Sequence, residues 1–476
     1  MLARIKQIEI DFFKSALTKD SKIMPTAEIL HWIKKKNKEI ETSVVEIPLD
    51  RMRSWKFETS TGNIVHESGK FFSIEGIQIQ TDWGKISNWE QPIINQPEIG
   101  FLGIIGKKIN DVLHFLMQAK IEPGNINIAQ ISPTLQATKS NYSRVHKGKA
   151  PLFLEYFNGE KPVKILLDQL QSEQGARFLR KRNRNIIIEI SENELMEVPE
   201  NFIWVTLGQL KELIKSDNII NMDTRTVISG IPFGSYETDT LNYFSVLNNL
   251  EHRNEHLLNS MLNGQVFMND FDQIISWITN LKSKFDLVVR NKNLNAIKDW
   301  AYNGMSINHK DNKYFSVIGV HVEISNRESI SWDQPMVKPT QEGIMAFVVK
   351  PFDGVYHFLV QAKLEAGNFD ILELAPTLQC LTGNYRTGLN EYAVPFLNEV
   401  LNAEESQIWY SSYQSEEGGR FYKEQNRNMI VEAGKNFPSE IPENYCWMTL
   451  NQLLTFIRFN NYLNIAARSL ISAVSF

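Results

Sequence analysis

The chain has 476 residues, of which 22% are charged and 42% hydrophobic, with a formal net charge of −5. This length suffices for two or three domains with separate cores, and the absence of a long basic stripe excludes a general nucleic-acid binder. Because Cys380 and Cys446 are its two cysteines, disulfide scaffolds and thiolate metal sites are not expected. No apolar run approaches the roughly 18 residues of a membrane span, so we expect a cytoplasmic protein with no membrane partner.

Helical spacing of apolar residues marks the start of each half of the chain. It predicts helices over residues 5–17 and 26–38, separated by the breaker Pro25. Their counterparts in the second half lie near 250–262 and 269–286.

Short strand patterns follow these helices. Period-two alternation predicts half-buried strands over 72–80 and 315–323. A helix near 206–216 closes the first unit and has a counterpart in the second, with Thr206 or Thr449 as the N-cap. Further short apolar runs closed by Gly, Pro or Asn lie at 101–105, 112–119, 126–131 and 185–190.

The chain is a tandem duplication. Residues 89–142 and 332–385 match at 22 of 54 positions when they are aligned without a gap. We therefore predict an α+β protein with two repeats, residues 1–235 and 246–476, joined by a linker near 230–245.

Polar residues are kept between the copies. Gln, Lys, Glu, Asn, Arg and Tyr cost little to change on a surface, whereas in a pocket each fixes a hydrogen bond, so we interpret the kept set as pocket lining. The alternative is that these groups satisfy buried backbone at tight corners, as Gly124-Asn125 and Asn141 would.

Lys120 and Glu122 lie two positions apart in a strand-like stretch, which directs both side chains to the face that also carries Gln118. A cation, a carboxylate and an amide on one face suit an acid or base beside a charge stabiliser. A salt bridge on a solvated face would give the same pattern.

Familiar cofactor motifs are missing from the sequence. Residues 100–106 match a glycine-rich dinucleotide loop only superficially, because a polar turn precedes them and strand-like residues follow. No phosphate-binding Walker loop, serine-nucleophile elbow or zinc spacing is present, so no cofactor and no metal are expected.

Four blocks make the chain resemble the nucleotide-diphosphate-hexose 2,3-dehydratases of deoxysugar biosynthesis. They span residues 115–125, 132–142, 415–421 and 426–429, and the resemblance covers essentially the whole chain. It implies a duplicated Nudix-like α/β/α fold, a homodimer and a substrate such as dTDP-4-keto-6-deoxy-D-glucose. It also implies two nucleotide-sugar pockets per subunit, one catalytic and the other a relic. The carboxylate-rich helix of hydrolytic Nudix proteins is missing, so a magnesium-dependent hydrolase is not expected.

The implied dehydration needs a base for the hydrogen on carbon 3, an acid for the departing hydroxyl on carbon 2, and donors facing the enolate oxygen. We predict Glu122 as the base and Tyr142 or His146 as the acid. Lys120 and Gln118 are predicted to stabilise the enolate.

Arginines and aromatic rings are the predicted binding groups. Arg177 and Arg184 suit bidentate recognition of the diphosphate, and Trp89 suits stacking on a base or sugar, although core packing would explain it equally. The other predicted contacts in the first half are Thr138, Asn141, Arg144 and Asn183. The predicted second pocket comprises Trp332, Gln361, Lys363, Glu365, Asn384, Tyr385, Arg420, Asn426 and Arg427.

The first copy is favoured as the catalytic one because the second lacks counterparts of Arg144 and His146. Two rival functions stay open from the sequence. A non-catalytic nucleotide-sugar binding protein would need only the pockets, and a nucleotide-sugar hydrolase would release free nucleoside phosphate.

Overall fold

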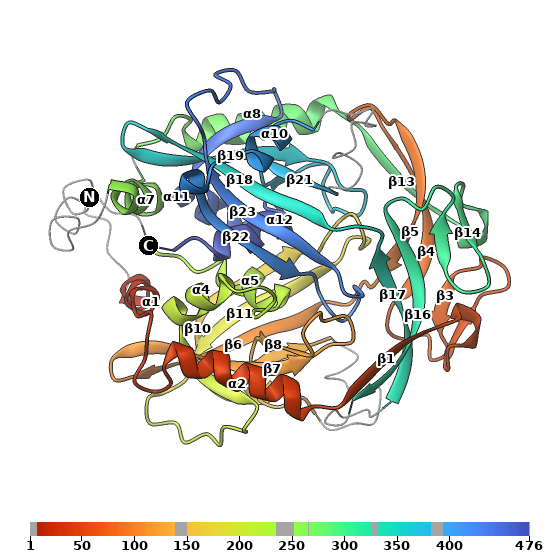
Figure 1. Cartoon of the computed structure of the whole chain (residues 1–476), viewed down its shortest axis with the longest axis horizontal. Coiled ribbons are helices and arrows are strands. Elements are labelled where there is room, and N and C mark those ends of the chain that lie inside the picture. Colours follow the sequence, from red (N-terminus) through yellow and green to blue (C-terminus); the bar gives the residue numbers. More distant parts are fainter. Residues whose placement is uncertain are drawn as a thin grey trace.

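Each half of the chain builds one seven-stranded sheet, and both halves contribute to two smaller five-stranded sheets (Figure 1). The computed structural model describes residues 7–138, 150–234, 252–264, 266–324, 331–381 and 394–475. No helix within these ranges is long and apolar enough to cross a membrane.

The helices and strands of the two halves follow one order. In the first half they are α1 (Gln7–Leu17), α2 (Thr26–Glu39), β1 (Thr42–Ile47), β2 (Trp55–Phe57), β3 (Ile64–His66), β4 (Ser73–Thr81), β5 (Asn88–Asn95), β6 (Gly100–Ile109), β7 (Val112–Ile121), β8 (Ala129–Ser132), β9 (Leu135–Ala137), β10 (Lys164–Ser172), β11 (Arg182–Glu189), β12 (Phe202–Thr206), α4 (Leu207–Ile214) and α5 (Met222–Ile228).

The second half repeats this order. Its elements are α7 (His252–Leu262), α8 (Phe271–Lys284), β13 (Leu287–Lys292), β14 (Trp300–Tyr302), β15 (Ile307–His309), β16 (Phe315–Ile324), β17 (Ser331–Pro339), β18 (Gly343–Phe352), β19 (Val355–Lys363), β20 (Glu373–Ala375), β21 (Leu378–Leu381), α10 (Leu397–Leu401), β22 (Ile408–Ser415), β23 (Gln425–Glu432), β24 (Tyr445–Thr449), α11 (Leu450–Ile457) and α12 (Ile465–Ser472).

The large sheets are mixed. In the first half the strand order is β10-β11-β6-β7-β12, with β8 pairing β7 and β9 pairing β6. Strands β6 and β11 run parallel, whereas β6 and β7 form an antiparallel hairpin. The second half repeats this with β22-β23-β18-β19-β20, where β24 pairs β19 and β21 pairs β18.

The halves exchange one strand each. Strand β1 of the first half pairs antiparallel with β16 of the second, and β13 of the second half pairs antiparallel with β4 of the first. Both exchanged strands lie in the small sheets, at the opposite end of the molecule from α1 and α7 (Figure 1). The two repeats are therefore interlocked by backbone hydrogen bonds.

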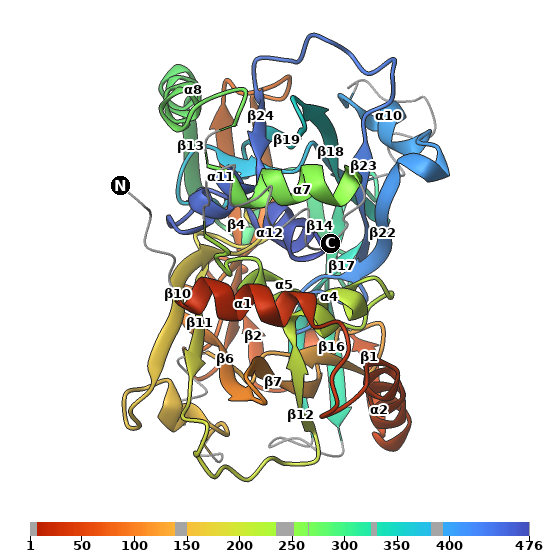
Figure 2. The ribbon, with the colours of Figure 1, turned by 90° about the vertical axis from the view of Figure 1, so that its left-hand side faces the viewer.

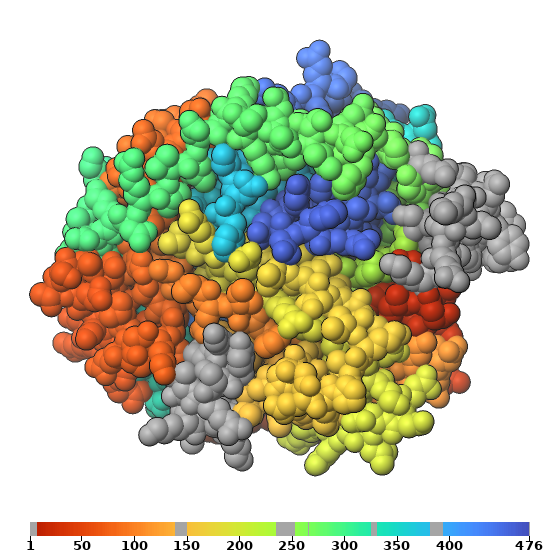
Figure 3. Space-filling model, turned by 180° about the vertical axis from the view of Figure 1, so that it is seen from behind, coloured from red at the N-terminus to blue at the C-terminus, as the bar shows by residue number. Residues whose placement is uncertain are grey.

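A large hydrophobic cluster joins the halves. Phe12 and Ile29 of the first two helices and Phe115 of β7 belong to the same buried cluster as Phe347 and Phe358 of the second half. Helix α5 packs against α12 near the middle of the molecule (Figure 2). Viewed from behind, the two halves meet along a seam, with most of the first half below and most of the second half above (Figure 3).

The predicted helices at the start of each half are confirmed, and Thr206 and Thr449 cap α4 and α11 in reciprocal capping boxes. The expectation of a single closing helix was wrong, because α5 and α12 follow. Their side chains are buried almost throughout, so α5 lacks the polar face from which a helical period is recognised.

Candidate functional site

A carboxylate held by two neighbours lies at the end of β7. Glu122 Oε1 accepts a hydrogen bond of 2.8 Å from Gln136 Nε2 and lies 3.7 Å from Lys120 Nζ. Glu122 is only 6% exposed, yet its Oε2 has no hydrogen-bond partner among the described residues. A buried carboxylate oxygen without a hydrogen-bond partner is uncommon in folded proteins, so Glu122 marks a candidate site.

Gln136 is positioned by the cap of α5. Asn221 Oδ1 accepts from Thr224 N at 2.8 Å and so caps the helix, while Asn221 Nδ2 lies 3.3 Å from Gln136 Oε1. Ile220 forms a parallel bridge with Ile131 of β8, which places the start of α5 beside this carboxylate. Glu122 is therefore oriented by Gln136, which is itself held by Asn221.

The second half covers this carboxylate with a loop, residues 416–422. Gly124 N donates to Gly418 O at 2.7 Å, and Lys423 N donates to Gly124 O at 2.8 Å. A Cβ at Gly124 would lie 1.7 Å from Phe421 O, so only glycine allows this approach. We call the resulting cluster of Lys120, Glu122, Gln136, Asn221 and this loop the first site.

Two further carboxyl groups join the first site. Asp223, in the first turn of α5, is 2% exposed, and Glu417 on the covering loop is half-buried. Neither side chain has a hydrogen bond or ion pair with another described residue. Burial and the nearby Glu122 raise the pKa of Asp223 well above its ordinary value. The same two causes raise the pKa of Glu417 to about 7.

The second half holds a counterpart, which we call the second site. Gln379 Nε2 donates to Glu365 Oε1 at 2.9 Å, Asn464 Nδ2 donates to Gln379 Oε1 at 2.8 Å, and Lys363 Nζ donates to Gln379 O at 3.3 Å. Its covering loop, residues 173–179, comes from the first half. Gly367 N of the second half donates to Gly175 O of this loop at 2.7 Å.

Because the loops cross, the structure groups the two arginines differently from the sequence. Arg177, predicted for the first pocket, lies on the loop that covers Glu365, whereas Arg420, predicted for the second, lies on the loop that covers Glu122. The Arg420 guanidinium stacks 4.0 Å from the Phe72 ring centroid. Alignment of the two repeats shows which positions are equivalent. It does not show that the loop of one half covers the site of the other.

Several residues kept in both halves hold the loops rather than reach the carboxylates. Trp89 Nε1 donates to Gln91 Oε1 at 2.9 Å, and Gln91 Nε2 donates to Ala176 O at 3.0 Å. Trp332 and Gln334 repeat this arrangement. The two glutamines therefore satisfy backbone carbonyl groups of the loops, which was the alternative to pocket lining.

Residues 183 and 184 point to opposite faces of β11. Asn183 Nδ2 donates to Glu173 Oε1 at 2.7 Å, as Asn426 does to Glu416 at 2.6 Å, so these asparagines orient glutamates at the base of each loop. Arg184 instead makes a two-pronged ion pair with Asp168. The structure does not bring Arg184 to either site, and its counterpart Arg427 donates to Ser411 Oγ.

Gln118 and Gln361 are half-buried on β7 and β19, two residues before the lysines, and Thr138 lies just after β9. The predictions that concern Asn141, Tyr142, Arg144, His146, Asn384 and Tyr385 lie outside the described residues.

Sequence analysis missed Asn221, Asp223 and Glu417 as site residues, and it did not assign a role to Gln136. Gln136 and Asn221 had a signal, since both recur in the second half as Gln379 and Asn464. Asp223 and Glu417 do not recur and had none. Within the described residues, no group of three or more His, Cys, Asp or Glu side chains is arranged to hold a metal ion.

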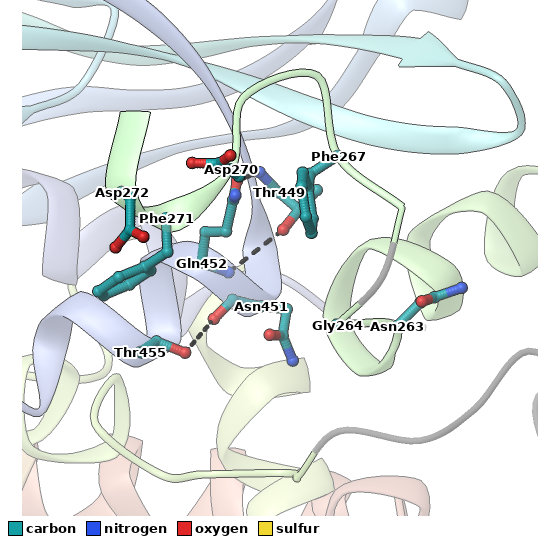
Figure 4. Close-up of a pocket in the computed structure, with 10 residues that line it drawn as sticks. All are labelled: Asn263, Gly264, Phe267, Asp270, Phe271, Asp272, Thr449, Asn451, Gln452 and Thr455. Atoms are coloured by element: carbon teal, nitrogen blue, oxygen red, sulfur yellow. Dashed lines mark hydrogen bonds between the residues drawn. The ribbon is translucent and has the colours of Figure 1, made fainter. Parts of the chain in front are cut away.

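A pocket of 390 Å³ lies elsewhere, between α7, α8 and α11 (Figure 4). Its polar lining is largely engaged in helix capping: Asp270 caps α8, while Thr449 and Gln452 form the capping box of α11. Asp272, which also lines the pocket, is exposed. The pocket therefore lacks the buried, unpaired carboxylates of the two sites.

Comparison with known proteins covers both repeats. The sequence model described as NDP-hexose 2,3-dehydratase matches residues 26–231 and 271–474. A protein named dTDP-4-dehydro-6-deoxy-alpha-D-glucopyranose 2,3-dehydratase from Saccharopolyspora spinosa is 42% identical over 97% of this chain and 94% of its own length. Proteins of the same name from Amycolatopsis orientalis and Streptomyces violaceoruber are 40% and 38% identical, over 97% and 95% of this chain and 92% and 98% of their own lengths.

Proposed function

The chain belongs to the NDP-hexose 2,3-dehydratase family, and on this basis we propose that it is a hydro-lyase that removes water across carbons 2 and 3 of dTDP-4-keto-6-deoxy-D-glucose. The observation that supports this reaction most directly is the Glu122 carboxylate, which is buried, oriented by Gln136 and without a hydrogen-bond partner at Oε2 among the described residues. The product is a 3,4-diketo-2,6-dideoxy sugar nucleotide.

The ketone at carbon 4 acidifies the hydrogen on carbon 3, so a carboxylate can act as the base. Glu122 fits this role, because Lys120 and Gln136 hold its Oε1 while its Oε2 has no hydrogen-bond partner among the described residues. Loss of the proton places negative charge on the carbon 4 oxygen. The ammonium of Lys120, which is 15% exposed, is the nearby cation that can stabilise this enolate, with Gln118 beside it on β7.

Other parts of the proposal rest on the family resemblance. They are the Nudix-like description of each repeat, assembly as a homodimer, and a cytoplasmic location. Binding of the diphosphate is assigned to the loop arginines, with Arg420 serving the first site in place of Arg177. Arg184 is left out of this assignment because Asp168 occupies its guanidinium.

The direct test is to incubate the purified protein with dTDP-4-keto-6-deoxy-D-glucose. We expect loss of one water from the sugar nucleotide, and capture of the resulting 1,2-diketone by an aromatic ortho-diamine. Release of free nucleoside phosphate would instead indicate a hydrolase. Binding without any change in the sugar would indicate a non-catalytic nucleotide-sugar binding protein.

A further inference from the structure

Three hydrogen bonds in series connect the backbone of α5 with the Glu122 carboxylate. Thr224 N donates to Asn221 Oδ1 at 2.8 Å, and Asn221 Nδ2 donates to Gln136 Oε1 at 3.3 Å. Gln136 Nε2 then donates to Glu122 Oε1 at 2.8 Å. Asn221 is only 2% exposed, so its amide is shielded from water.

The direction of this series is fixed at its start. A side-chain amide can turn over and exchange its donor for its acceptor, whereas a backbone N–H group is only a donor. Because Thr224 N must donate, Asn221 presents its oxygen to the helix and its nitrogen to Gln136. Gln136 is therefore held with its own nitrogen toward Glu122.

The second half repeats the series with the same direction. Ala467 N donates to Asn464 Oδ1 at 2.9 Å, and Asn464 Nδ2 donates to Gln379 Oε1 at 2.8 Å. Gln379 Nε2 donates to Glu365 Oε1 at 2.9 Å. Every donor and acceptor of the first series has its equivalent, so the direction belongs to the frame of the sites.

Gln136 contacts both members of the ion pair at the end of β7. Its side chain donates to Glu122, and its backbone oxygen lies 3.5 Å from Lys120 Nζ. The backbone at Gln136 is itself fixed, because β9 pairs with β6 and places Gln136 opposite Leu102. A change in the Gln136 amide therefore alters what Glu122 meets without moving the strand.

The charged groups around Glu122 come from three elements. Lys120 lies on β7, Asp223 on α5, and Glu417 and Arg420 on the covering loop, and each interacts electrostatically with Glu122. Among them, the Gln136 amide decides whether Oε1 meets a donor or an acceptor. An ionised carboxylate only accepts, so a donor favours the ionised form and an acceptor favours the protonated form.

We propose that Asn221 is a positioning residue for the dehydration: it holds the Gln136 amide with its nitrogen toward Glu122, and so keeps Glu122 in the ionised form that removes the hydrogen on carbon 3. This inference rests on the proposed function. Glu122 takes the proton, and the electron pair of the broken carbon–hydrogen bond forms the enolate between carbons 3 and 4. Asn221 acts through Gln136 and takes no part in this proton transfer.

Asn221→Asp reverses the series but keeps the helix cap. The introduced carboxylate still accepts from Thr224 N, and Asp caps helices as well as Asn does. Its other oxygen also accepts, so the Gln136 amide turns its oxygen toward Glu122. We expect the acidic limb of kcat/KM for water elimination to move to higher pH by about 1–2 pH units. Exchange of the carbon 3 hydrogen for deuterium in D₂O, which reports removal of that hydrogen, should shift equally.

A double-mutant cycle with Gln136→Met separates this reversal from the added negative charge. Without the Gln136 amide nothing can turn over, so Asn221→Asp should shift the limb much less in that background. Asn221→Ser supplies a second test, because Ser keeps the cap and adds no charge. It releases the Gln136 amide without reversing it, so a smaller shift in the same direction is expected.

The matched comparison is Asn464→Asp, since Asn464 caps α12 and holds Gln379 in the same way. Its melting temperature should change as that of Asn221→Asp does, because both caps are kept. The acidic limb should stay at its wild-type position, since Gln379 contacts Glu365 and not Glu122. An equal shift of the limb in Asn464→Asp would contradict the role assigned to Asn221.

Three further outcomes would overturn the inference while wild type still dehydrates the substrate. One is an acidic limb at the wild-type position in both Asn221 variants. Another is a loss of activity that is equal at every pH, which a purely structural role would give. The third is the same shift with and without Gln136, which would assign the effect to charge alone. Failure of the wild-type protein to remove water or to exchange the carbon 3 hydrogen would instead contradict the proposed function.

Discussion

The first and second sites share a frame of side chains but differ in the carboxyl groups around it. In both, a glutamine oriented by a helix-capping asparagine donates to a buried glutamate, and a glycine admits the covering loop of the other half. Around this frame the first site has Asp223 and Glu417, whereas the second has Glu373 opposite Lys363, where the first has Gln130 opposite Lys120. Duplication preserves what packing requires, because a change in the frame leaves buried groups unpaired. The carboxyl groups outside this frame differ between the two copies.

The largest expected contrast is between Glu122→Gln and Glu365→Gln. These glutamates are 6% and 5% exposed and accept matching hydrogen bonds, so the structural cost of the two substitutions is comparable. We expect Glu122→Gln to lower turnover by about 10²- to 10⁴-fold and to abolish carbon 3 exchange. The loss for Glu365→Gln should be at least about tenfold smaller. Steady-state kinetics with each variant decides, and equal losses would contradict an asymmetric pair of sites.

Equivalent substitutions that disrupt the packing between the halves should lower the free energy of unfolding by similar amounts. Arg225 and Arg468 are fully buried equivalents that cross the seam, with Arg225 donating to Gln414 Oε1 and Arg468 to Ser172 O. Replacing either by Met leaves acceptors unpaired, at about 1–3 kcal/mol for each acceptor. Denaturant unfolding should show similar losses for both variants. A large loss of unfolding free energy for one variant alone would mean that the two arginines do not stabilise the fold equally.

A pH-dependent difference should distinguish the two covering loops. The folded-state pKa of Glu417, about 7, lies above the ordinary 4.5, so the folded protein binds the extra proton between these values and loses stability as the pH rises through about 7. Glu417→Gln cannot titrate there. The melting temperature of Glu417→Gln, taken relative to that of wild type, should therefore increase as the pH is raised from below 4.5 to above about 7. A difference that does not change with pH would show that Glu417 is not buried beside other carboxylates.

The smallest effect is expected outside both sites. Arg184 is partly exposed and paired with Asp168, so Arg184→Ala should cost less than about 1 kcal/mol of unfolding free energy. Turnover and substrate affinity should stay at wild-type values. A raised KM would restore the sequence-based assignment of Arg184 to the diphosphate.

Local sequence patterns and comparison of the two halves predicted the repeat, the helices that open each half, and the helix caps at Thr206 and Thr449. They also predicted that Lys120 and Glu122 lie on one face of a strand, where the two form an ion pair. Each of these depends on neighbours in sequence or on the same positions in the other copy. Periodicity also placed β4 and β16, because their faces alternate between buried and less buried positions.

Tertiary structure alone decided which groups share a site. The exchange of β1 and β13 and the crossing of the loops join residues whose spacing in the chain carries no signal. Packing between the halves brings such residues together, and it removes water from them. The sequence by itself determined which carboxyl groups exist and which of them recur, whereas burial in the folded chain decided which of them, such as Asp223 and Glu417, have raised pKa values.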